Sequence, residues 1–365
     1  MTVKRGLIFL HRWLGLITGI VVLIVCITGS LYVFKDEIEN VTQSYRFVKP
    51  QQLPVKSPGE IKDIAEKNLP GKSIRGVDYK GNDHSLCVSF YDYNPQYYYL
   101  MYINPYTGKV MKIKDMSRDF FRLIIEGHCY LWLPPAIGAP IVAISTLVFI
   151  FLFLSGLFIW FPRKIKRSRF LMKWKAGWKR RIYDLHTIVG FYFSLILLIV
   201  AMTGLVWGFQ WFGNGLYWIT SGGKQIEERV QIASVPPTVI SKTVTSLDSL
   251  FNKVCKEYPD SEIISLSYPA DKESTIQISV NNNAGTYWKT DYYYFDQYSF
   301  KEIKTTNGIR GKLSDASGAD KLRRMNYDIH TGAIGGIWGK ILVFIAALFA
   351  ASLPVTGFIL WWRKR

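Results

Sequence analysis

The chain has 365 residues, of which 49% are hydrophobic, and a formal net charge of +18. A chain of this length could form two or three soluble domains. Four long uncharged apolar runs exclude a wholly soluble protein; they cover residues 13–34, 136–162, 187–223 and 341–362. Each run reaches the roughly 20 helical residues that a hydrocarbon core of about 30 Å requires. We therefore predict a membrane protein with four spanning helices.

Basic residues are concentrated beside the ends of these runs. The link between the second and third runs holds ten of them and no acid. Such a stretch can bind nucleic acid, but between two spans the positive-inside rule explains it. We expect a bacterial inner (cytoplasmic) membrane, cytoplasmic N and C termini, large periplasmic domains and no nucleic-acid partner. The basic residues are Lys4, Arg5 and Arg12, then Arg163, Lys164, Lys166, Arg167, Arg169, Lys173, Lys175, Lys179, Arg180 and Arg181, and finally Arg363, Lys364 and Arg365.

The first run is interpreted as an uncleaved span, because it is longer than the apolar region of a signal peptide and no A-x-A cleavage site follows it. The four cysteines, Cys26, Cys87, Cys129 and Cys255, form neither CxxC nor CxxCH. This spacing argues against structural zinc and against covalently attached c-type haem. It leaves disulfides, and the roles of Cys87, Cys129 and Cys255, open.

The expected organisation alternates spans with folded segments. In chain order we expect transmembrane helix 1 (1–34), a first periplasmic domain (35–127), transmembrane helix 2 (128–162), a basic cytoplasmic loop (163–182), transmembrane helix 3 (183–213), a second periplasmic domain (214–328), and transmembrane helix 4 with a cytoplasmic tail (329–365).

Each periplasmic segment has an α+β pattern. In the first, a helix over 57–67 precedes strands over 86–90, 97–103 and 109–111. In the second, a helix over 247–258 precedes strands over 263–268, 275–280 and 288–295. The spans repeat as well: an offset of 175 places His11 on His186 and Gly15 on Gly190, and an offset of 201 places Gly156 on Gly357. The chain is therefore predicted to contain two parallel copies of helix, outer domain and helix.

Four of the five histidines occupy equivalent places in the two copies. His11 and His186 begin the outward-running helices, and His128 and His330 precede the inward-running ones. Each membrane face thus receives one histidine from each copy. Two imidazoles that face each other across a helix bundle are an axial ligand set for b-type haem. We predict two haem b groups, one held by His11 and His186 and one by His128 and His330.

Small and basic residues near the histidines fit this prediction. Gly15 and Gly190 lie one helical turn beyond His11 and His186, and Gly29 and Gly204 lie five turns beyond them on the same faces. Glycines would leave room for a flat macrocycle, although in spans they more often permit close helix packing. Cations at the edges, which topology alone also explains, could hold haem propionates. Those cations are Arg12 or Arg181 inside, and Arg122 with Arg323 or Arg324 outside. The fifth histidine, His84, is expected to be a surface residue.

The opening helix, with His11-Arg12-Trp13-Leu14-Gly15 and then Thr28-Gly29, resembles that of the PepSY-associated transmembrane family. The outer segments resemble PepSY domains, the first through its Pro105-Tyr106-Thr107-Gly108 turn; the second departs from that pattern at Ser299-Phe300-Lys301. The family includes di-haem ferric-siderophore reductases of the inner membrane. The resemblance implies His11, His186, His128 and His330 as haem-iron ligands. The fold class expected is a four-helix transmembrane bundle built from two parallel repeats, with two periplasmic α+β PepSY-like domains.

Three functions remain open at this point. The first is a transmembrane electron carrier that reduces a ferric siderophore or other Fe(III) chelate in the periplasm for iron uptake. Because no GxGxxG or P-loop motif is present, its electron donor would be a separate quinol or cytoplasmic reductase. The second is a PepSY-based binding or regulatory membrane protein without redox activity, which leaves the histidine pairing unexplained. The third is a permease, for which four helices blocked by cofactor make a poor path.

Aromatic residues are frequent in the outer segments. They usually indicate sheet packing or an interfacial belt, and some of them are alternatively candidates for binding a chelate. The residues are Tyr91, Tyr93, Tyr97, Tyr98, Tyr99 and Tyr102 in the first segment, Tyr287, Trp288, Tyr292, Tyr293 and Tyr294 in the second, and Trp211, Tyr217 and Trp218 near the outer membrane edge.

Overall fold

A computed structural model describes residues 3–161, 166–226, 232–236 and 246–362. The expected basic residues Arg163, Lys164, Arg363, Lys364 and Arg365 lie outside these ranges. The chain divides into two compact units. The membrane unit comprises Met1–Lys35, Phe120–Leu216 and Asn326–Arg365, and the sheet unit comprises Asp36–Asp119 and Tyr217–Met325.

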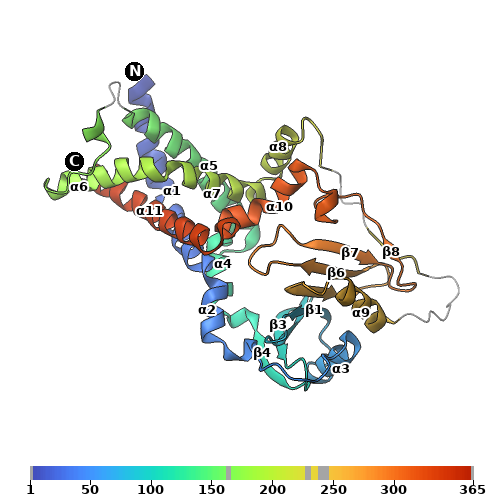
Figure 1. Cartoon of the computed structure of the whole chain (residues 1–365). Helices are drawn as coiled ribbons and strands as arrows, with labels where there is room; N and C mark the ends of the chain where they lie inside the picture. Colours follow the sequence, from blue (N-terminus) through green and yellow to red (C-terminus); the bar gives the residue numbers. More distant parts are fainter. Residues whose placement is uncertain (1–2, 162–165, 227–231, 237–245, 363–365) are drawn as a thin grey trace. The chain divides into compact units, whose positions relative to one another are not determined.

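The membrane unit contains four helical segments that are long and apolar enough to cross a bilayer, which confirms the predicted spans. They are α1 (Val3–Val33), α5 (Pro135–Trp160), the continuous segment α6–η4–α7 (Trp178–Gly208), and α11 (Gly336–Trp362) (Figure 1). Helix α1 packs against α5 and α11, and α7 packs against the same two helices. Phe153, Leu197, Ala346 and Ala350 fill the centre of this bundle.

Two of the expected spans need correction, because each contains two helices rather than one. Segment 128–162 holds the end of α4 (Phe120–Tyr130) and then α5; segment 329–365 holds the end of α10 (Gly318–Thr331), η6 (Ala333–Gly335) and α11. Leu131 and Trp132, with φ of 56° and 57°, turn the chain between α4 and α5. The Trp132 side chain secures this unusual backbone: its Nε1 donates to the Leu123 carbonyl over 2.8 Å.

The third apolar run is also interrupted. Helix α7 (Gly190–Gly208) ends before Phe209, which is extended, and a separate helix α8 (Gln210–Thr220) follows. The expected boundary of transmembrane helix 3 at residue 213 therefore falls inside α8. Trp211, Trp218 and Ile219 on α8 are 62%, 55% and 70% exposed. Large exposed aromatic residues beyond the end of a span are typical of the membrane interface.

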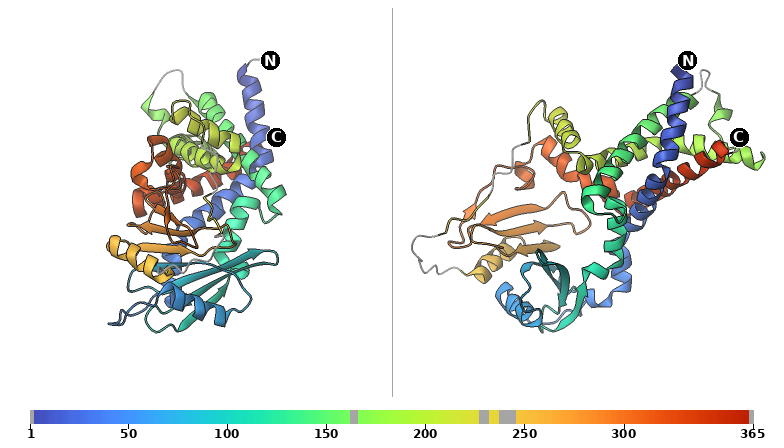
Figure 2. Two further views of the ribbon diagram at one scale, coloured as in Figure 1. Left: turned by 90° about the vertical axis from the view of Figure 1, so that its right-hand side faces the viewer. Right: turned by 180° about the vertical axis from the view of Figure 1, so that it is seen from behind.

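The sheet unit contains one antiparallel sheet of eight strands in the order β4-β3-β2-β1-β5-β6-β7-β8 (Figure 2). The first outer segment supplies β1 (Ile74–Lys80), β2 (Leu86–Tyr93), β3 (Gln96–Ile103) and β4 (Val110–Asp115). The second supplies β5 (Ile263–Ser267), β6 (Ile276–Asn281), β7 (Asp291–Phe295) and β8 (Glu302–Ile303). Antiparallel pairing of β1 with β5, which sets Val77 opposite Leu266, joins the halves. The two expected domains are thus halves of a single sheet.

Helices α3 (Pro58–Asn68) and α9 (Leu247–Glu257) pack on one face of this sheet. Alternate strand residues such as Val88, Phe90 and Ile278 point into the shared core, because successive side chains of a strand face opposite sides. The sheet unit also contains η1 (Ser44–Arg46), η2 (Met116–Arg118), η5 (Leu313–Asp315), most of α2 (Lys35–Thr42) and the first part of α10.

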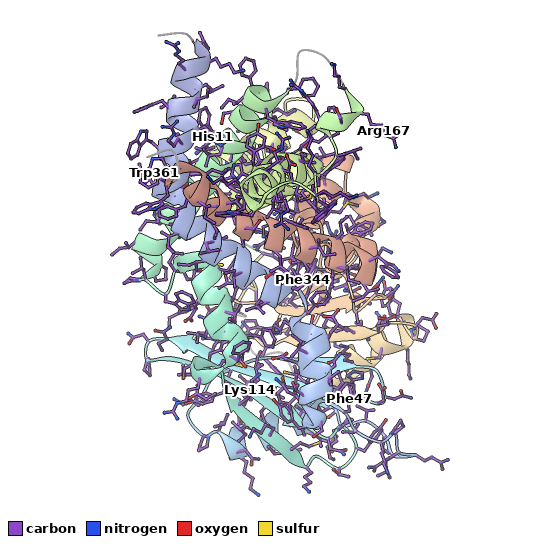
Figure 3. The ribbon with its side chains drawn as sticks, turned by 90° about the vertical axis from the view of Figure 1, so that its left-hand side faces the viewer. His11, Phe47, Lys114, Arg167, Phe344 and Trp361 are labelled. Carbon is purple, nitrogen blue, oxygen red and sulfur yellow. The ribbon has the colours of Figure 1, made fainter. Side chains whose placement is uncertain are left out.

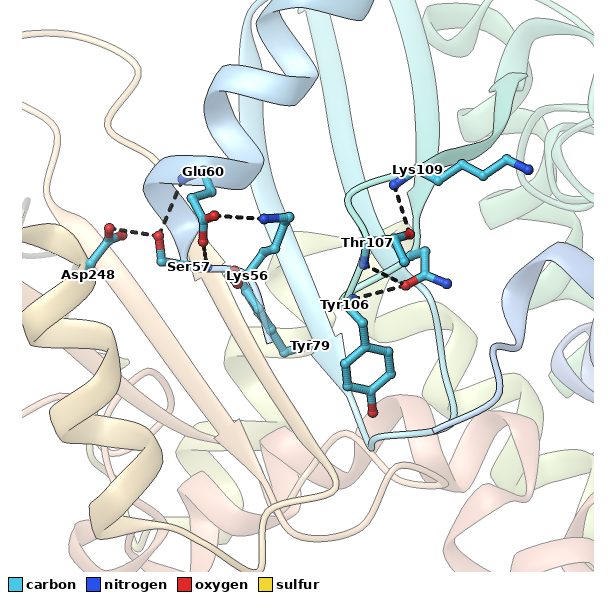
Figure 4. A network of polar contacts seen from close by, with 9 residues as sticks. Lys56, Ser57, Glu60, Tyr79, Tyr106, Thr107, Lys109 and Asp248 are labelled. Atoms are coloured by element: carbon cyan, nitrogen blue, oxygen red, sulfur yellow. Dashed lines mark hydrogen bonds and ion pairs between the residues drawn. The ribbon is translucent and has the colours of Figure 1, made fainter. Parts of the chain in front are cut away.

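Capping fixes the start of α3, as the sequence Ser57-x-x-Glu60 predicts. The Ser57 hydroxyl accepts from the Glu60 N–H, and the Glu60 carboxylate accepts from the Ser57 N–H. The Lys56 ammonium and then the Ser57 N–H hold the pKa of Glu60 below its usual value. Asp248, in the first turn of α9, accepts from the Ser57 hydroxyl over 2.7 Å and from the Gly59 N–H over 2.8 Å (Figure 4). This carboxylate links the starts of the two helices.

Candidate functional site

His11 and His186 each hydrogen-bond a hydroxyl on a neighbouring helix. His11 Nδ1, on α1, lies 2.9 Å from Ser155 Oγ on α5. His186 Nδ1 lies 2.9 Å from Thr356 Oγ1 on α11. In both rings the Nδ1 atom is engaged, and this leaves Nε2 as the nitrogen available to a metal.

A glycine follows each of these hydroxyl residues and lies against the histidine ring. A Cβ atom built on Gly156 would stand 3.1 Å from Cε1 of His11, and one built on Gly357 would stand 3.4 Å from Cε1 of His186. The first distance is shorter than ordinary van der Waals contact, and the second lies at its lower limit. The two glycines therefore allow the rings to lie close to α5 and α11.

His186 lies in η4 (Leu185–Val189), a π-helical turn between α6 (Trp178–Asp184) and α7. A π turn is wider than an α-helical turn and re-aims the side chains that follow it; such turns occur often at functional sites. His11, by contrast, lies in the uninterrupted α-helix α1. The same side-chain contact is thus built on two different backbones.

His11 and His186 both line one cavity of about 340 Å³ in the membrane unit. Gly15 and Gly190 line it too, and a Cβ at either position would meet only a leucine side chain at 3.7–3.8 Å. The remaining wall is largely apolar and aromatic. It includes Phe149, Phe153, Trp160, Tyr183, Phe191, Phe358 and Trp361, and Figure 3 labels His11 and Trp361. The structure therefore brings the predicted inner pair and its two glycines to one hydrophobic cavity.

His128 on α4 and His330 on α10 face each other directly. Their ring centroids are 6.0 Å apart with an angle of 68° between the planes. His128 Nδ1 lies 2.8 Å from the Val25 carbonyl oxygen on α1. His330 Nδ1 lies 3.0 Å from the Val200 carbonyl oxygen on α7 and 3.0 Å from Thr203 Oγ1. Because a carbonyl only accepts hydrogen bonds, Nδ1 carries the proton in both rings and Nε2 presents its lone pair.

Gly29 and Gly204 lie against this second pair of rings. A Cβ on Gly29 would stand 2.8 Å from Cε1 of His128, and a Cβ on Gly204 would stand 3.3 Å from Cε1 of His330. The sequence pattern predicts that these glycines provide clearance for a macrocycle. In the structure the side chains that need the space are the histidine rings.

The residues present fit a metal held between two imidazoles. Ligand nitrogens at roughly 2 Å on opposite sides of an ion place the two ring centroids roughly 6 Å apart. The observed spacing between His128 and His330 is 6.0 Å. At the inner pair, the cavity bordered by glycines supplies space for a macrocycle. Both pairs have the donor set of a bis-histidine haem.

The candidate propionate-binding cations differ in their surroundings. Arg12 lines the inner cavity, whose wall does not include Arg181. Arg122 on α4 forms an ion pair with Glu126 over 2.7 Å. In the sheet unit, Arg324 donates to the backbone carbonyls of Thr290, Gly308 and Gly311, and Arg323 precedes it on α10. Arg12 is therefore the cation placed best for a ligand of the inner cavity.

The Nδ1 partners of the histidines are not among the residues predicted from the sequence. Ser155 and Thr356 were detectable, since each precedes one of the glycines that the 201-residue offset pairs. The Val25 and Val200 carbonyls could not be predicted as partners from residue type, because they are backbone groups. His84 is half-buried rather than exposed: its Nδ1 lies 2.6 Å from Asp83 Oδ1 and its ring contacts Phe47. Cys26, Cys87, Cys129 and Cys255 form no disulfide in the part of the chain that the structure describes.

The aromatic residues of the sheet fall on both of its faces. Tyr97, Tyr99 and Tyr293 pack into or against the hydrophobic core, as expected from strand packing. Tyr98, between two core-facing neighbours on β3, lies on the opposite face.

The pattern of the family described as PepSY-associated TM region matches residues 9–364 of the chain. The protein belongs to this family. The match extends over all four spans and both halves of the sheet, so it confirms the family that HRWLG and the PepSY-like turns indicated. No curated protein matches the chain.

Proposed function

We propose that this PepSY-associated membrane protein transfers electrons across the bacterial inner membrane through two haem b groups and reduces ferric siderophores or other Fe(III) chelates in the periplasm. The observation that carries the proposal is the four-fold recurrence of one arrangement. Each paired histidine has a bonded Nδ1, a ring against a glycine of another helix, and an Nε2 left for a metal.

The arrangement recurs with the sequence offsets of an internal repeat. Ser155 and Gly156 serve His11, and Thr356 and Gly357, 201 residues later, serve His186. Val25 and Gly29 serve His128, and Val200 and Gly204, 175 residues later, serve His330. Residues that only packed helices together would not need to preserve a histidine, its Nδ1 partner and its glycine jointly. This supports two parallel repeats, each of which contributes one ligand to each metal.

Haem b, when bound, supplies a one-electron Fe(III)/Fe(II) couple. The chain's own residues hold it and set its surroundings. The four Nε2 atoms are the proposed ligands, and the Nδ1 partners orient the rings. The aromatic wall of the inner cavity keeps water from that site, and Arg12 offers a charge-assisted contact to a carboxylate.

The direction of transfer follows from topology. The basic residues beside the spans support a topology with both termini and the link between α5 and α6 in the cytoplasm, and with the sheet unit in the periplasm. Siderophores bind hard Fe(III) through oxygen ligands and hold Fe(II) far less tightly, so reduction on the periplasmic side releases the iron. With His11 and His186 holding one haem and His128 and His330 the other, no ligand position would remain open, so the chelate would accept an electron without bonding to the haem iron. The donor, a quinol or a cytoplasmic reductase, acts at the opposite face.

The test combines cofactor content with reaction kinetics. Wild-type protein purified from cells supplied with haem is expected to carry close to two low-spin b haems per chain. His330→Ala and His186→Ala should each lose one, while His84→Ala, the matched control, keeps both. In stopped-flow measurements, ferric chelates should rapidly oxidise the dithionite-reduced wild type, and His330→Ala should lose this reaction although its inner haem remains reducible.

Two outcomes count against the proposal. A colourless wild-type protein would favour a PepSY-based binding or regulatory role without redox activity. If His330→Ala retains only the inner haem and still oxidises as fast as wild type, reduction does not occur at the outer site.

A further inference from the structure

The connection between α5 and α6 carries a strong positive charge. Residues 166–181, called the basic segment below, contain eight lysine and arginine residues and no acid. Most of these residues are exposed, and Arg167 lies at the periphery of the membrane unit (Figure 3). The function proposed above does not use this charge beyond its effect on topology.

The basic segment also exposes large apolar side chains. Trp174 is 71% exposed, Leu171 is 51% exposed and Trp178 is 42% exposed. Basic and apolar side chains alternate closely here, as in Lys173-Trp174-Lys175. Exposed tryptophan and leucine among lysines are typical of segments that lie in a membrane interface.

The backbone of the basic segment is fastened to the bundle. The Phe170 ring packs against Trp160 and Phe191, with its centroid 5.4 Å from each of theirs. The Tyr192 hydroxyl donates to the Phe170 carbonyl over 3.1 Å. The exposure of Trp174 and Leu171 is therefore a property of a positioned segment, in which the neighbouring Phe170 is half-buried.

A buried carboxylate provides the second attachment. Asp184 is fully buried, accepts from the Lys173 N–H over 3.1 Å, and pairs with Arg180 Nε over 2.9 Å. This pair neutralises one arginine and leaves the remaining positive charges without an acidic neighbour in the segment. Asp184 stands two residues before His186, so the segment is tied to the helix that carries an inner histidine.

We infer that the basic segment is a binding site for anionic phospholipid headgroups. Lys173, Lys175 and Lys179 contact the lipid phosphates, and Trp174 with Leu171 inserts between the headgroups. The connectivity favours this occupant: the segment joins the ends of two spans, so the bilayer surface is always within reach. Charge alone would also suit an acidic protein. The exposed Trp174 and Leu171 favour the membrane interface over an acidic protein, because indole is enriched at the interface and anionic lipid attracts lysine there.

The test measures lipid retention by the full-length protein. Protein purified in neutral detergent is mixed with equal amounts of phosphatidylglycerol and phosphatidylcholine, and bound lipid is counted by native mass spectrometry. Wild type should retain phosphatidylglycerol preferentially. Each lysine near an anionic surface contributes about fivefold, so Lys173→Gln/Lys175→Gln/Lys179→Gln should lower this preference by at least about tenfold. Lys67→Gln/Lys253→Gln/Lys256→Gln, on the exposed surfaces of α3 and α9, removes the same charge elsewhere and should leave it unchanged.

A second measurement locates Trp174 directly. In nanodiscs that contain brominated phosphatidylglycerol, wild type should show more quenching of tryptophan emission than Trp174→Phe. The inference is wrong if the triple variant at positions 173, 175 and 179 retains phosphatidylglycerol like wild type, or if Trp174→Phe is quenched as strongly as wild type. Absence of a phosphatidylglycerol preference together with tight binding of polyglutamate would also overturn it, and would assign the segment to an acidic protein. None of these measurements depends on haem or on reductase activity.

Discussion

The inner and outer histidine pairs share the arrangement of a bonded Nδ1 and an adjacent glycine, but they have different hydrogen-bond partners. The inner rings contact the hydroxyls of Ser155 and Thr356, whereas the outer rings contact the carbonyls of Val25 and Val200. A hydroxyl can donate or accept, but a carbonyl can only accept. The outer pair is therefore fixed in the tautomer that presents Nε2 to a metal. The inner pair is fixed in the same tautomer, because the Ser155 and Thr356 hydroxyls donate their protons to the Leu152 and Leu353 carbonyls and therefore accept from Nδ1.

The two pairs also differ in the free volume around their rings. Gly29 lies closer to its histidine ring than any of the other three glycines, and the outer rings already stand at the separation expected across one ion. The inner rings border an open cavity with two further glycines, Gly15 and Gly190. The outer site thus depends on exact packing of the rings, and the inner site depends on free volume.

The largest expected effect comes from adding side chains at these glycines of α1. Gly29→Ala forces a methyl against His128, whose ring is held by the Val25 carbonyl and faces His330. Overpacking of this kind costs about 1–3 kcal/mol, so the variant should lose most of the outer haem and keep the inner one. Gly15→Leu should do the reverse, because the leucine fills the inner cavity. Haem content and the optical spectrum of each purified variant measure the outcome.

Gly6→Ala is the control on the same helix, since a Cβ there meets nothing within 4 Å. It should keep both haems, and the alanine should stabilise α1 by up to about 1 kcal/mol. Full haem content in both Gly29→Ala and Gly15→Leu, with only a lowered melting temperature, would mean that these glycines serve helix packing.

A smaller effect is expected from removal of the Nδ1 partners of the inner pair. Ser155→Ala and Thr356→Val delete the hydroxyls that orient His11 and His186. Loss of a group that hydrogen-bonds a metal-ligating histidine lowers metal affinity by about 10–100-fold. Haem titration of the apoprotein should show this loss at the inner site alone. Thr203→Val is the comparison: His330 Nδ1 keeps the Val200 carbonyl, so the outer affinity should fall less. An equal loss in all three variants would contradict the distinction between hydroxyl and carbonyl partners.

How far the sequence predicts this molecule depends on the range of the interactions involved. The spans follow from uncharged runs, and the start of α3 follows from the local pair Ser57 and Glu60. The sequence offsets between the two halves predict the histidine pairs, because equivalent positions of two parallel copies are expected at the same membrane face. The cavity shared by His11 and His186, and the close approach of His128 and His330, agree with that prediction.

Other features depend on contacts between distant residues. The pairing of β1 with β5 links strands nearly 200 positions apart. The residue types of Ile74–Lys80 do not predict which strand pairs with them. The left-handed Leu131 and Trp132 are stabilised by a hydrogen bond from Trp132 to Leu123, not by glycine or asparagine. The π turn at His186 likewise leaves no pattern in residue type. In each case tertiary contacts override the local preference of the backbone.

The smallest expected effect concerns charge at the two sites. Arg12 lines the inner cavity but is exposed, whereas Arg122 on the helix of His128 is already paired with Glu126. A charge-assisted contact from an exposed arginine is worth about 0–1 kcal/mol because solvent screens it. Arg12→Gln should therefore weaken haem binding at the inner site by up to about fivefold, and Arg122→Gln should change the outer site less, since Glu126 competes for that guanidinium. Titration of apoprotein with haem at low and at 0.5 M salt measures both affinities. The loss in Arg12→Gln should shrink at high salt if it reflects a screened contact. A loss that persists at high salt would show that Arg12 acts through the packing of its side chain on the cavity wall.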